Sequence, residues 1–302
     1  MKLNFFILFL LAGVNHVYAF PELVRHGYTS CTSCHVSPNG GGQLTRYGRS
    51  LSRELLSTWG YQGEEDVLHG LIPTGEKFIA GGDVRFLQVY RDTERTRTAR
   101  FFPMQVAFEA TAYPHPNVGF NGVVAYERAK DSEGKGGRAI SPQHYVIYTP
   151  SSNLVLRFGK FQRPFGINSP EHSLASKSRM GIGPGMEKYH IELTQIEDKY
   201  EVTVAGTLGS IDRTESDERG LTVRPQVIFG NFKLGMSYAF LKSTDTVKHQ
   251  LGPFFIWGIS NTWTALAEMD WEWKEDNSLF MRTNQNFVKV LHEVYQGINP
   301  YV

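Results

Sequence analysis

The chain has 302 residues, and its 31 basic and 30 acidic side chains leave a net charge of only +1. A near-neutral chain is not expected to bind nucleic acid, because contacts to phosphates need a basic surface. Aromatic residues make up 13% of the chain and there are 30 glycines. This composition suits either a soluble β-sandwich or a membrane β-barrel.

Residues 1–19 are typical of a secretory signal peptide. Lys2 supplies the positive charge, residues 5–14 the apolar run and residues 17–19 the small-residue cleavage pattern, so Phe20 should be the first mature residue. A membrane anchor is the alternative, but this apolar run is too short to cross a bilayer as a helix. No later stretch approaches about eighteen apolar residues, so we expect no transmembrane helix in the mature chain.

The only two cysteines of the chain follow in the pentapeptide Cys31-Thr-Ser-Cys34-His35. This spacing lets two thiols add to the two vinyl groups of haem while the adjacent imidazole binds the iron. Export is also required for that attachment in bacteria, so the signal peptide and the motif support each other. We therefore expect one covalent haem c, attached through Cys31 and Cys34, with His35 as the proximal iron ligand.

Other uses of the cysteine pair are less consistent with the surrounding sequence. A thioredoxin-like redox pair needs a βαβ context, and residues 36–42 cannot begin a helix. Zinc needs four ligands in a closed site, and no second pair of Cys or His follows at a suitable spacing. A structural disulfide stays open as an alternative in an oxidising compartment, although it leaves His35 unexplained.

The distal iron ligand is not obvious from the sequence. His26 lies five residues before Cys31, and a turn at Gly27 could bring it over the opposite face of the haem. His69 could fold back as an alternative distal ligand, and an open site or a ligand from a partner remain further possibilities. Methionine is not expected, because the first one after the haem segment, Met104, lies in a predicted strand.

Residues 20–76 are expected to form the haem segment and its linker. Within this segment, residues 44–59 carry apolar side chains close to helical spacing, at Leu44, Tyr47, Leu51, Leu55 and Trp59. We expect a short amphipathic helix that packs on the edge of the haem, with Tyr47 among the cofactor-binding residues. The segment is too small to bury a haem alone, so it must pack against something larger.

Residues 77–302 have apolar side chains at every second position, which predicts strands with one apolar and one polar face. These strands run to about ten residues or more, the length that a tilted strand needs to cross a bilayer. The predicted fold is therefore all-β, an antiparallel transmembrane β-barrel of about twelve strands. The clearest apolar faces are Phe102, Met104, Val106, Phe108, Ala110 and Ala112; Val118, Phe120, Val124 and Tyr126; Leu234, Met236, Tyr238 and Phe240; and Trp263, Ala265, Ala267, Met269, Trp271 and Trp273.

The connections support the barrel, because short turns on one side and long loops on the other are typical of transmembrane barrels. This regularity weakens toward the C-terminus, because the later connections on the long-loop side, near 242–246 and 274–277, are short as well. Residues 292–302 resemble a turn and the start of another strand, although Pro300 would interrupt pairing. Short turns are expected at 113–117, 150–153, 196–198, 229–231 and 258–261, and longer loops at 92–98, 129–138, 163–187 and 209–220.

The polar faces of the predicted strands indicate a lumen of mixed charge. Such a lining could position a cationic partner or set ion preference, and ordinary solvated lumen residues are the alternative. The residues concerned are Asp83, Arg85, Glu109, Glu127, Arg157, Glu268, Asp270 and Glu272.

Three stretches resemble one family, the bacterial outer-membrane barrels that carry a single N-terminal c-type haem. The first is Arg25-His-Gly-Tyr-x-x-Cys31-x-x-Cys34-His35-x-Ser-Pro-x-Gly-Gly-Gly-x-Leu-Thr-x-Tyr47. The second, Gly81-Gly-Asp83-Val-Arg85-x-Leu-Gln88, is similar to the first strand of that group. The third, Gly159-Lys160-Phe-Gln-Arg-Pro164-Phe-Gly166-Ile-Asn-Ser-Pro-Glu-His172, is similar to its porin-like strand end and loop. The resemblance implies an outer-membrane location and a role beside the porin–cytochrome conduits.

The functional expectation is an electron relay between periplasmic donors and a partner in or beside the pore, with the haem segment on the periplasmic side. Its expected partners are periplasmic or outer-membrane cytochromes and the lipid bilayer. The sequence offers no catalytic triad, phosphate loop or paired carboxylates, so we expect an electron-transfer protein and not an enzyme. The alternatives are a diffusion porin whose haem segment is a plug or redox-sensitive gate, and an open-coordinate haem enzyme acting on peroxide or nitrogen oxides.

Overall fold

The computed structural model describes most of the chain from Pro21 onward. The expected signal peptide, Trp59 and His69 lie outside the described residues. Within the described part, no helix is long and apolar enough to span a membrane. The described residues are 21–58, 60–61, 63, 66, 75, 77–93, 97–128, 137–168, 175–210, 218–276 and 279–300.

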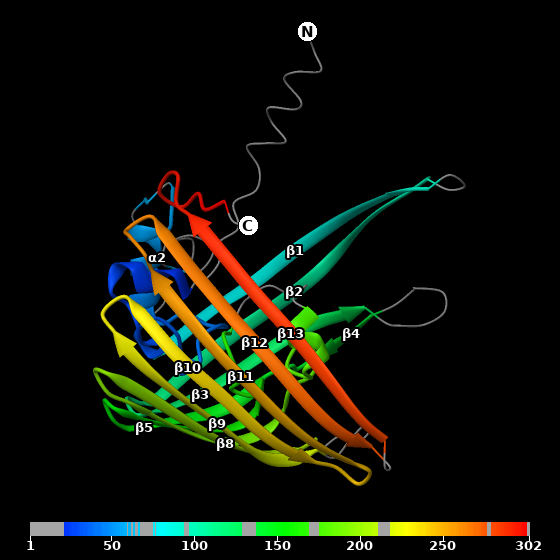
Figure 1. Ribbon diagram of the computed structural model, residues 1–302. Coiled ribbons are helices and arrows are strands. Elements are labelled where there is room, and N and C mark those ends of the chain that lie inside the picture. Colours follow the sequence, from blue (N-terminus) through cyan, green and yellow to red (C-terminus); the bar gives the residue numbers. More distant parts are fainter. Residues whose placement is uncertain are drawn as a thin grey trace.

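The fold is nearly all β, with short helical elements at the N-terminal end and in one loop (Figure 1). The helical elements are η1 (Pro21–His26), η2 (Cys31–Ser33), α2 (Arg46–Leu55) and α3 (Ala175–Arg179). The strands are β1 (Phe78–Asp92), β2 (Arg97–His115), β3 (Val118–Arg128), β4 (Gly137–Ile140), β5 (His144–Ser151), β6 (Leu154–Phe161), β7 (Lys188–Ile196), β8 (Tyr200–Gly209), β9 (Arg219–Phe229), β10 (Phe232–Lys242), β11 (Thr246–Gly258), β12 (Trp263–Asp276) and β13 (Leu279–His292).

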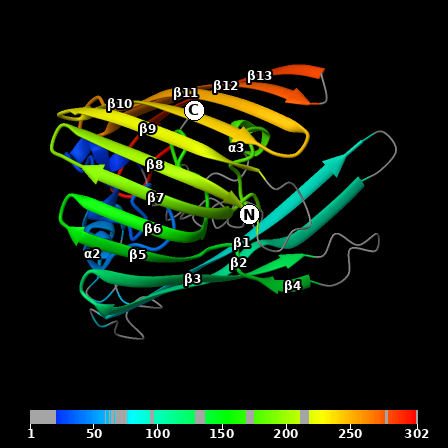
Figure 2. The same cartoon turned by 90° about the horizontal axis from the view of Figure 1, so that it is seen from below.

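The strands form one antiparallel sheet in which neighbours in sequence are neighbours in space. Twelve strands follow one another in the order of the chain, and the short β4 pairs with β3 beside that path. This sheet curls around the N-terminal elements (Figure 2). The prediction of an antiparallel barrel of about twelve strands is therefore confirmed. Among the described residues, β1 and β13 are not paired with each other.

Burial in the sheet is the reverse of that in a water-soluble protein. In β7, Ile191 and Leu193 are 52% and 40% exposed, whereas Glu192 and Thr194 on the opposite face are 1% and 0% exposed. An apolar outer surface around a polar interior is the pattern of a transmembrane barrel, because lipid replaces water outside. The fold is thus an antiparallel transmembrane β-barrel.

The alternation predicted for the later strands holds in the structure. In β10, Met236 and Tyr238 face outward and are exposed, while Ser237 between them is fully buried. In β12, Met269 is exposed whereas Glu268 and Asp270 are buried. The period of two therefore predicted both the strands and which of their faces would line the lumen.

The expected start of another strand after β13 is wrong for the described residues 293–300. These residues form a turn whose one bridge joins Tyr295 to Ile298, and His292 N donates to Pro300 O at 3.1 Å. Pro300 has no N–H to donate to a ladder, and the turn lies at the end of the barrel where the N-terminal elements lie (Figure 1).

A charged substitution on the outer face should reveal whether that face meets lipid. Ile191→Arg, near the middle of β7, should lower the free energy of unfolding in phospholipid vesicles by about 2–4 kcal/mol. Gln195→Arg, on the same strand close to the turn, is the control and should cost only about 0–1 kcal/mol. Denaturant unfolding followed by tryptophan fluorescence measures both, and equal small effects would contradict a lipid-facing surface.

Candidate haem site

The cysteine motif is wound into a single tight turn. Cys31–Ser33 form the 3₁₀ helix η2, and the amide groups of Cys34 and His35 both donate to Cys31 O, at 3.2 and 2.9 Å. Both cysteines are free thiols, and burial raises the pKa of the Cys34 thiol. The turn therefore brings both thiols and the imidazole to one short stretch of backbone.

A glycine-rich hairpin follows and returns to the histidine. Val36 N donates to Gln43 O at 3.0 Å, and His35 forms a bridge with Leu44. A Cβ on Gly40 (φ 74°) would come within 3.4 Å of Cys31 Sγ and 4.0 Å of His35 Cδ2. Glycine at this position keeps the space beside the thiol and the imidazole open, and it adopts the positive φ without strain.

The imidazole of His35 is held in one tautomer. Its Nδ1 lies 3.0 Å from Gly41 O, and a carbonyl can only accept, so Nδ1 carries the proton and the lone pair is on Nε2. Burial lowers the pKa of His35 to about 4, against hydrogen bonds to the backbone of Gly41 and Gly42 that raise it. A neutral imidazole whose other N–H is held by a backbone carbonyl is the arrangement that metal-binding histidines use.

These residues open onto a hollow between the N-terminal segment and the barrel wall, with about 620 Å³ of space including its open mouth. The N-terminal side contributes Leu23, Val24, Tyr28, Thr29, Ser30, Cys31, Cys34, His35, Asn39, Gly40 and Gly41. The β6–β7 loop contributes Ile167 and Asn168, and the barrel wall contributes Arg224, Lys233 and Ile256.

The residues of the hollow fit a covalently bound haem. Two thiols and an oriented imidazole are the three groups that a c-type haem needs, and Gly40 leaves the space beside them free. Leu23, Val24, Ile167 and Ile256 supply apolar surface for the porphyrin ring. Cys31, Cys34 and His35 would hold the group, which when bound supplies an iron centre that takes up and releases one electron.

Helix α2 packs directly on the motif. Thr45 caps its N-terminus and accepts from Gly48 N, while Thr45 N donates to Cys34 O at 2.8 Å. A Cβ on Gly48 would collide with the Cys34 carbonyl, so glycine is what allows this close approach. Leu51 of the same helix is buried against Leu23 and Cys34. The predicted amphipathic helix is present and supports the motif.

The haem segment extends deep into the barrel. Asn39 Nδ2 donates to Glu192 Oε2 at 2.7 Å, and Arg224 Nη1 donates to Asn39 Oδ1 at 3.2 Å. Arg157 donates to both Ser37 Oγ and Glu192 Oε2 at 2.9 Å. Arg224 lies five residues before the end of β9 at Phe229, which is roughly 17 Å along the strand at about 3.4 Å per residue.

The long loop between β6 and β7 enters the lumen from the opposite end. Gly166 N donates to Ser237 Oγ at 2.9 Å, and Ile167 N donates to Glu268 Oε2 at 2.8 Å. Asn168 Nδ2 then donates to Gly40 O at 2.7 Å, which joins this loop to the haem segment. The sequence predicted a long loop here but not that its described residues would fold inward.

Two of the predicted cofactor residues lie elsewhere. His26 Nε2 accepts from Arg25 Nε at 3.1 Å and is not among the residues that line the hollow. Tyr47 is 53% exposed, and its hydroxyl donates to that of Tyr28 at 3.2 Å instead of facing the hollow. The structure therefore brings together Cys31, Cys34 and His35, but not His26 or Tyr47.

The predicted lumen charges differ in how far they are buried. Arg157, Glu268, Asp270 and Glu272 are buried inside the barrel, whereas the side chain of Asp83 is 54% exposed and that of Arg85 is 24% exposed. Glu109 is partly buried and accepts from Asn121 at 3.0 Å, and the side chain of Glu127 lies outside the described residues.

Several residues of the site were not singled out from the sequence. Glu192, Arg224 and Lys233 are buried on the inner wall, and Asn39 and Asn168 connect the haem segment to that wall and to the loop. The alternation in β7, β9 and β10 could have identified the wall residues. No local pattern could have identified the two asparagines.

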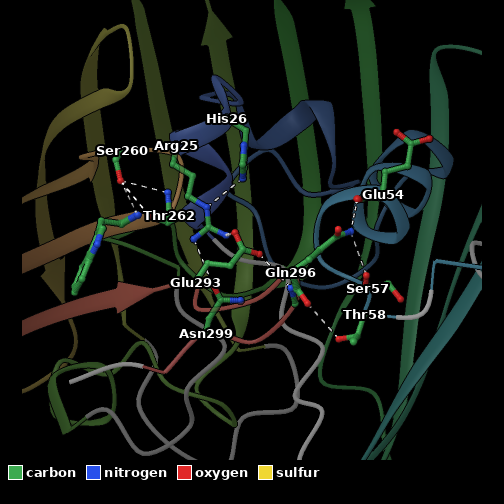
Figure 3. A network of polar contacts seen from close by, with 12 residues as sticks. Arg25, His26, Glu54, Ser57, Thr58, Ser260, Thr262, Glu293, Gln296 and Asn299 are labelled. Atoms are coloured by element: carbon green, nitrogen blue, oxygen red, sulfur yellow. Dashed lines mark hydrogen bonds and ion pairs between the residues drawn. The ribbon is translucent and has the colours of Figure 1, made fainter.

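Residues 293–300 fasten the haem segment to the barrel, and we name them the C-terminal clasp (Figure 3). Arg25, whose side chain is fully buried, forms an ion pair with Glu293 at 2.5 Å and donates to Asn299 Oδ1 at 3.3 Å. Gln296 Nε2 donates to Glu54 O at 2.6 Å and Ser57 O at 3.2 Å, near the end of α2. The clasp thus holds both η1 and α2.

Comparisons with known proteins find no matching family model and no matching curated protein. Among solved structures, the chain is similar to a loop L8 deletion mutant of OmpT, an outer membrane protein of Vibrio cholerae, at 12% identity and TM-score 0.43 over 73% of this chain and 91% of that one. Outer-membrane expressed OmpT of Vibrio cholerae matches at 11% identity and TM-score 0.40, over 72% and 82%. OpdQ of Pseudomonas aeruginosa matches at 11% identity and TM-score 0.37, over 71% and 60%.

These likenesses identify no substrate and no partner for this chain. The expectation that the chain is not an enzyme is nevertheless wrong as an exclusion, because a barrel can carry catalytic as well as non-catalytic sites. The absence of a familiar catalytic motif is therefore no ground for excluding catalysis.

The clasp generates a test of how the haem segment is held. Glu293→Ala leaves the buried Arg25 guanidinium without its carboxylate. Removing one partner of a buried ion pair in this way lowers the stability of the folded protein by about 3–5 kcal/mol. We expect faster amide hydrogen exchange over residues 21–58, measured by mass spectrometry. Glu275→Ala, an exposed carboxylate at the opposite end of β12, is the control, and equal exchange in both variants would show that the clasp does not hold the segment.

Proposed function

We propose that this chain is a bacterial outer-membrane barrel that carries one covalent haem c and relays electrons between a periplasmic donor and a partner in or beside the pore. The observation that carries the proposal is the pentapeptide Cys31-Thr-Ser-Cys34-His35 inside the barrel mouth, with the His35 tautomer held by Gly41. Partners of matching chemistry are periplasmic or outer-membrane cytochromes.

The outer-membrane location is supported by the reversed burial of the sheet, since transmembrane barrels of this kind belong to outer membranes. The orientation is supported by the connections. The haem segment lies at the short-turn end, where Asn231 in the β9–β10 turn donates to Arg25 O at 3.3 Å, and short turns in such barrels face the periplasm. A periplasmic donor would therefore meet the haem end.

The surrounding residues suit an electron-transfer site. Gly41 fixes the plane and tautomer of the His35 imidazole, while α2, the β6–β7 loop and the barrel wall restrict water around that imidazole. Axial ligation and burial are two of the controls on haem potential. Asn39 lines the same hollow and contacts Arg224 midway along β9, so the site lies inside the barrel and not only at its rim. A band about 25 Å tall still exceeds one haem, so a partner must continue the path.

The diffusion porin stays the second candidate, because the haem segment and the β6–β7 loop meet inside the lumen at Asn168 and Gly40. A lumen filled from both ends suits a plug or gate as well as a relay. In proteoliposomes we expect no sugar flux at porin rates from the intact chain, whether the haem is oxidised or reduced. Rapid flux that changes with oxidation state would favour the gated porin over the relay.

Haem attachment is the direct test of the relay. Produced in a host with cytochrome c maturation, the mature chain should be heavier than its polypeptide by one haem that survives denaturation. A variant with both Cys31→Ser and Cys34→Ser should lack that mass, because serine forms no thioether. Intact mass spectrometry decides the matter, and an unmodified mass for the native chain would refute the relay.

Axial ligation is tested separately by His35→Ala. This variant should keep both thioethers but lose the proximal nitrogen, so the visible spectrum should change from that of a six-coordinate low-spin haem. His26→Ala is the matched control, because His26 does not line the hollow. A changed spectrum in the control would instead make His26 the distal ligand.

A further inference from the structure

Two cationic side chains of the barrel wall reach the same hollow as the cysteine motif. Lys233, on β10, is 2% exposed, and Arg224, on β9, is 3% exposed. Arg224 lies in the middle of β9 and Lys233 lies at the beginning of β10, and both strands line the lumen. Neither residue belongs to the haem segment. Burying a cation costs free energy unless an anion pairs with it, so the burial of these two side chains beside the hollow requires an explanation.

Lys233 has no anionic partner in the described part of the chain. Its Nζ donates to the carbonyl of Thr29 at 2.7 Å, a neutral acceptor. Two other buried cations of this protein each meet a carboxylate, Arg157 with Glu192 and Arg25 with Glu293, and the half-buried Lys177 meets Glu268. Lys233 differs from these three in lacking a counter-charge, and resembles Arg163, which is buried against Met180 O and Gln250 Oε1.

Arg224 is only partly compensated. The nearest atom of Glu201 lies 3.9 Å from Arg224 Nη1, beyond hydrogen-bond distance, and Arg224 Nε has no partner. Among the described residues that line the hollow there are these two cations and no Asp or Glu. The hollow is thus a positively charged space that should take an anionic group.

We propose that Lys233 and Arg224 bind the carboxylate edge of the haem, so that the barrel wall as well as the N-terminal segment holds the cofactor. This inference rests on the proposed function. A haem carries its two carboxylates on the edge opposite its vinyl groups. The thiols of the N-terminal side would hold the vinyl edge, while an ammonium and a guanidinium across the hollow receive the carboxylates through charge-assisted hydrogen bonds.

The same lysine also bonds the chain that carries the thiols. Thr29, which accepts from Lys233 Nζ, lies two residues before Cys31. Lys233 would therefore contact both the cofactor and the segment to which the cofactor is attached. In this arrangement the lysine positions the haem and contributes a positive charge close to the iron.

The test is the equilibrium reduction of the haem-loaded protein. Lys233→Gln removes a positive charge, which favours ferric over ferrous haem, so the ratio of ferrous to ferric haem at a given ambient potential should fall about tenfold. That change corresponds to about 59 mV for a one-electron couple. Haem content and the visible spectrum should stay as in the native protein, and Lys233→Arg should restore most of the potential.

The matched control is Lys289→Gln, which removes another nearly buried lumen lysine that does not line the hollow. Its potential should equal that of the native protein. A haem-loaded Lys233→Gln protein with an unshifted potential would overturn the anchor and leave the relay intact. A changed spin state would also overturn it, since Lys233 would then be an iron ligand. A native chain without haem would instead refute the proposed function itself.

Discussion

Buried charge on the inner wall of the barrel is the interaction on which the rest of the structure depends. Lipid outside forces apolar side chains outward and leaves polar ones in the lumen, where charges must be paired. The haem segment takes part in that pairing, because Asn39 bridges Glu192 and Arg224. The haem segment is therefore held by the charged side chains that face the lumen because lipid lies outside the barrel. The segment is part of the barrel interior.

The β6–β7 loop extends this network to the candidate iron ligand. Glu268 on β12 accepts from Ile167 N, the adjacent Asn168 donates to Gly40 O, and Gly41 O holds the Nδ1–H of His35. Each step is a hydrogen bond to backbone, which has little freedom to move. A ligand held through such outer contacts keeps its orientation when the metal centre changes charge, and this suits a site that must reorganise little during electron transfer.

The fold and the motif could be predicted because both are local in sequence. Alternation within β10 or β12 involves neighbours two residues apart, and the cysteine motif spans five. The contacts that build the hollow are of another kind: Asn39 and Glu192 are 153 residues apart, Arg224 and Asn39 are 185 apart, and Arg25 and Glu293 are 268 apart. No periodicity connects such pairs, so the sequence could not show which residues of the N-terminal segment face the hollow. His26 and Tyr47 were expected at the haem for this reason, although they pack elsewhere.

The two edges of the sheet limit how this barrel can lie in lipid. β1 and β13 are unpaired with each other among the described residues, and a backbone group that meets hydrocarbon without a partner costs several kcal/mol. The haem segment already reaches one edge strand, because Arg49 of α2 donates to Ala80 O at 2.5 Å. In the membrane the remaining edge groups must also be covered. Under the proposed relay, a partner that covered them would lie beside the lumen, where the next electron carrier is needed.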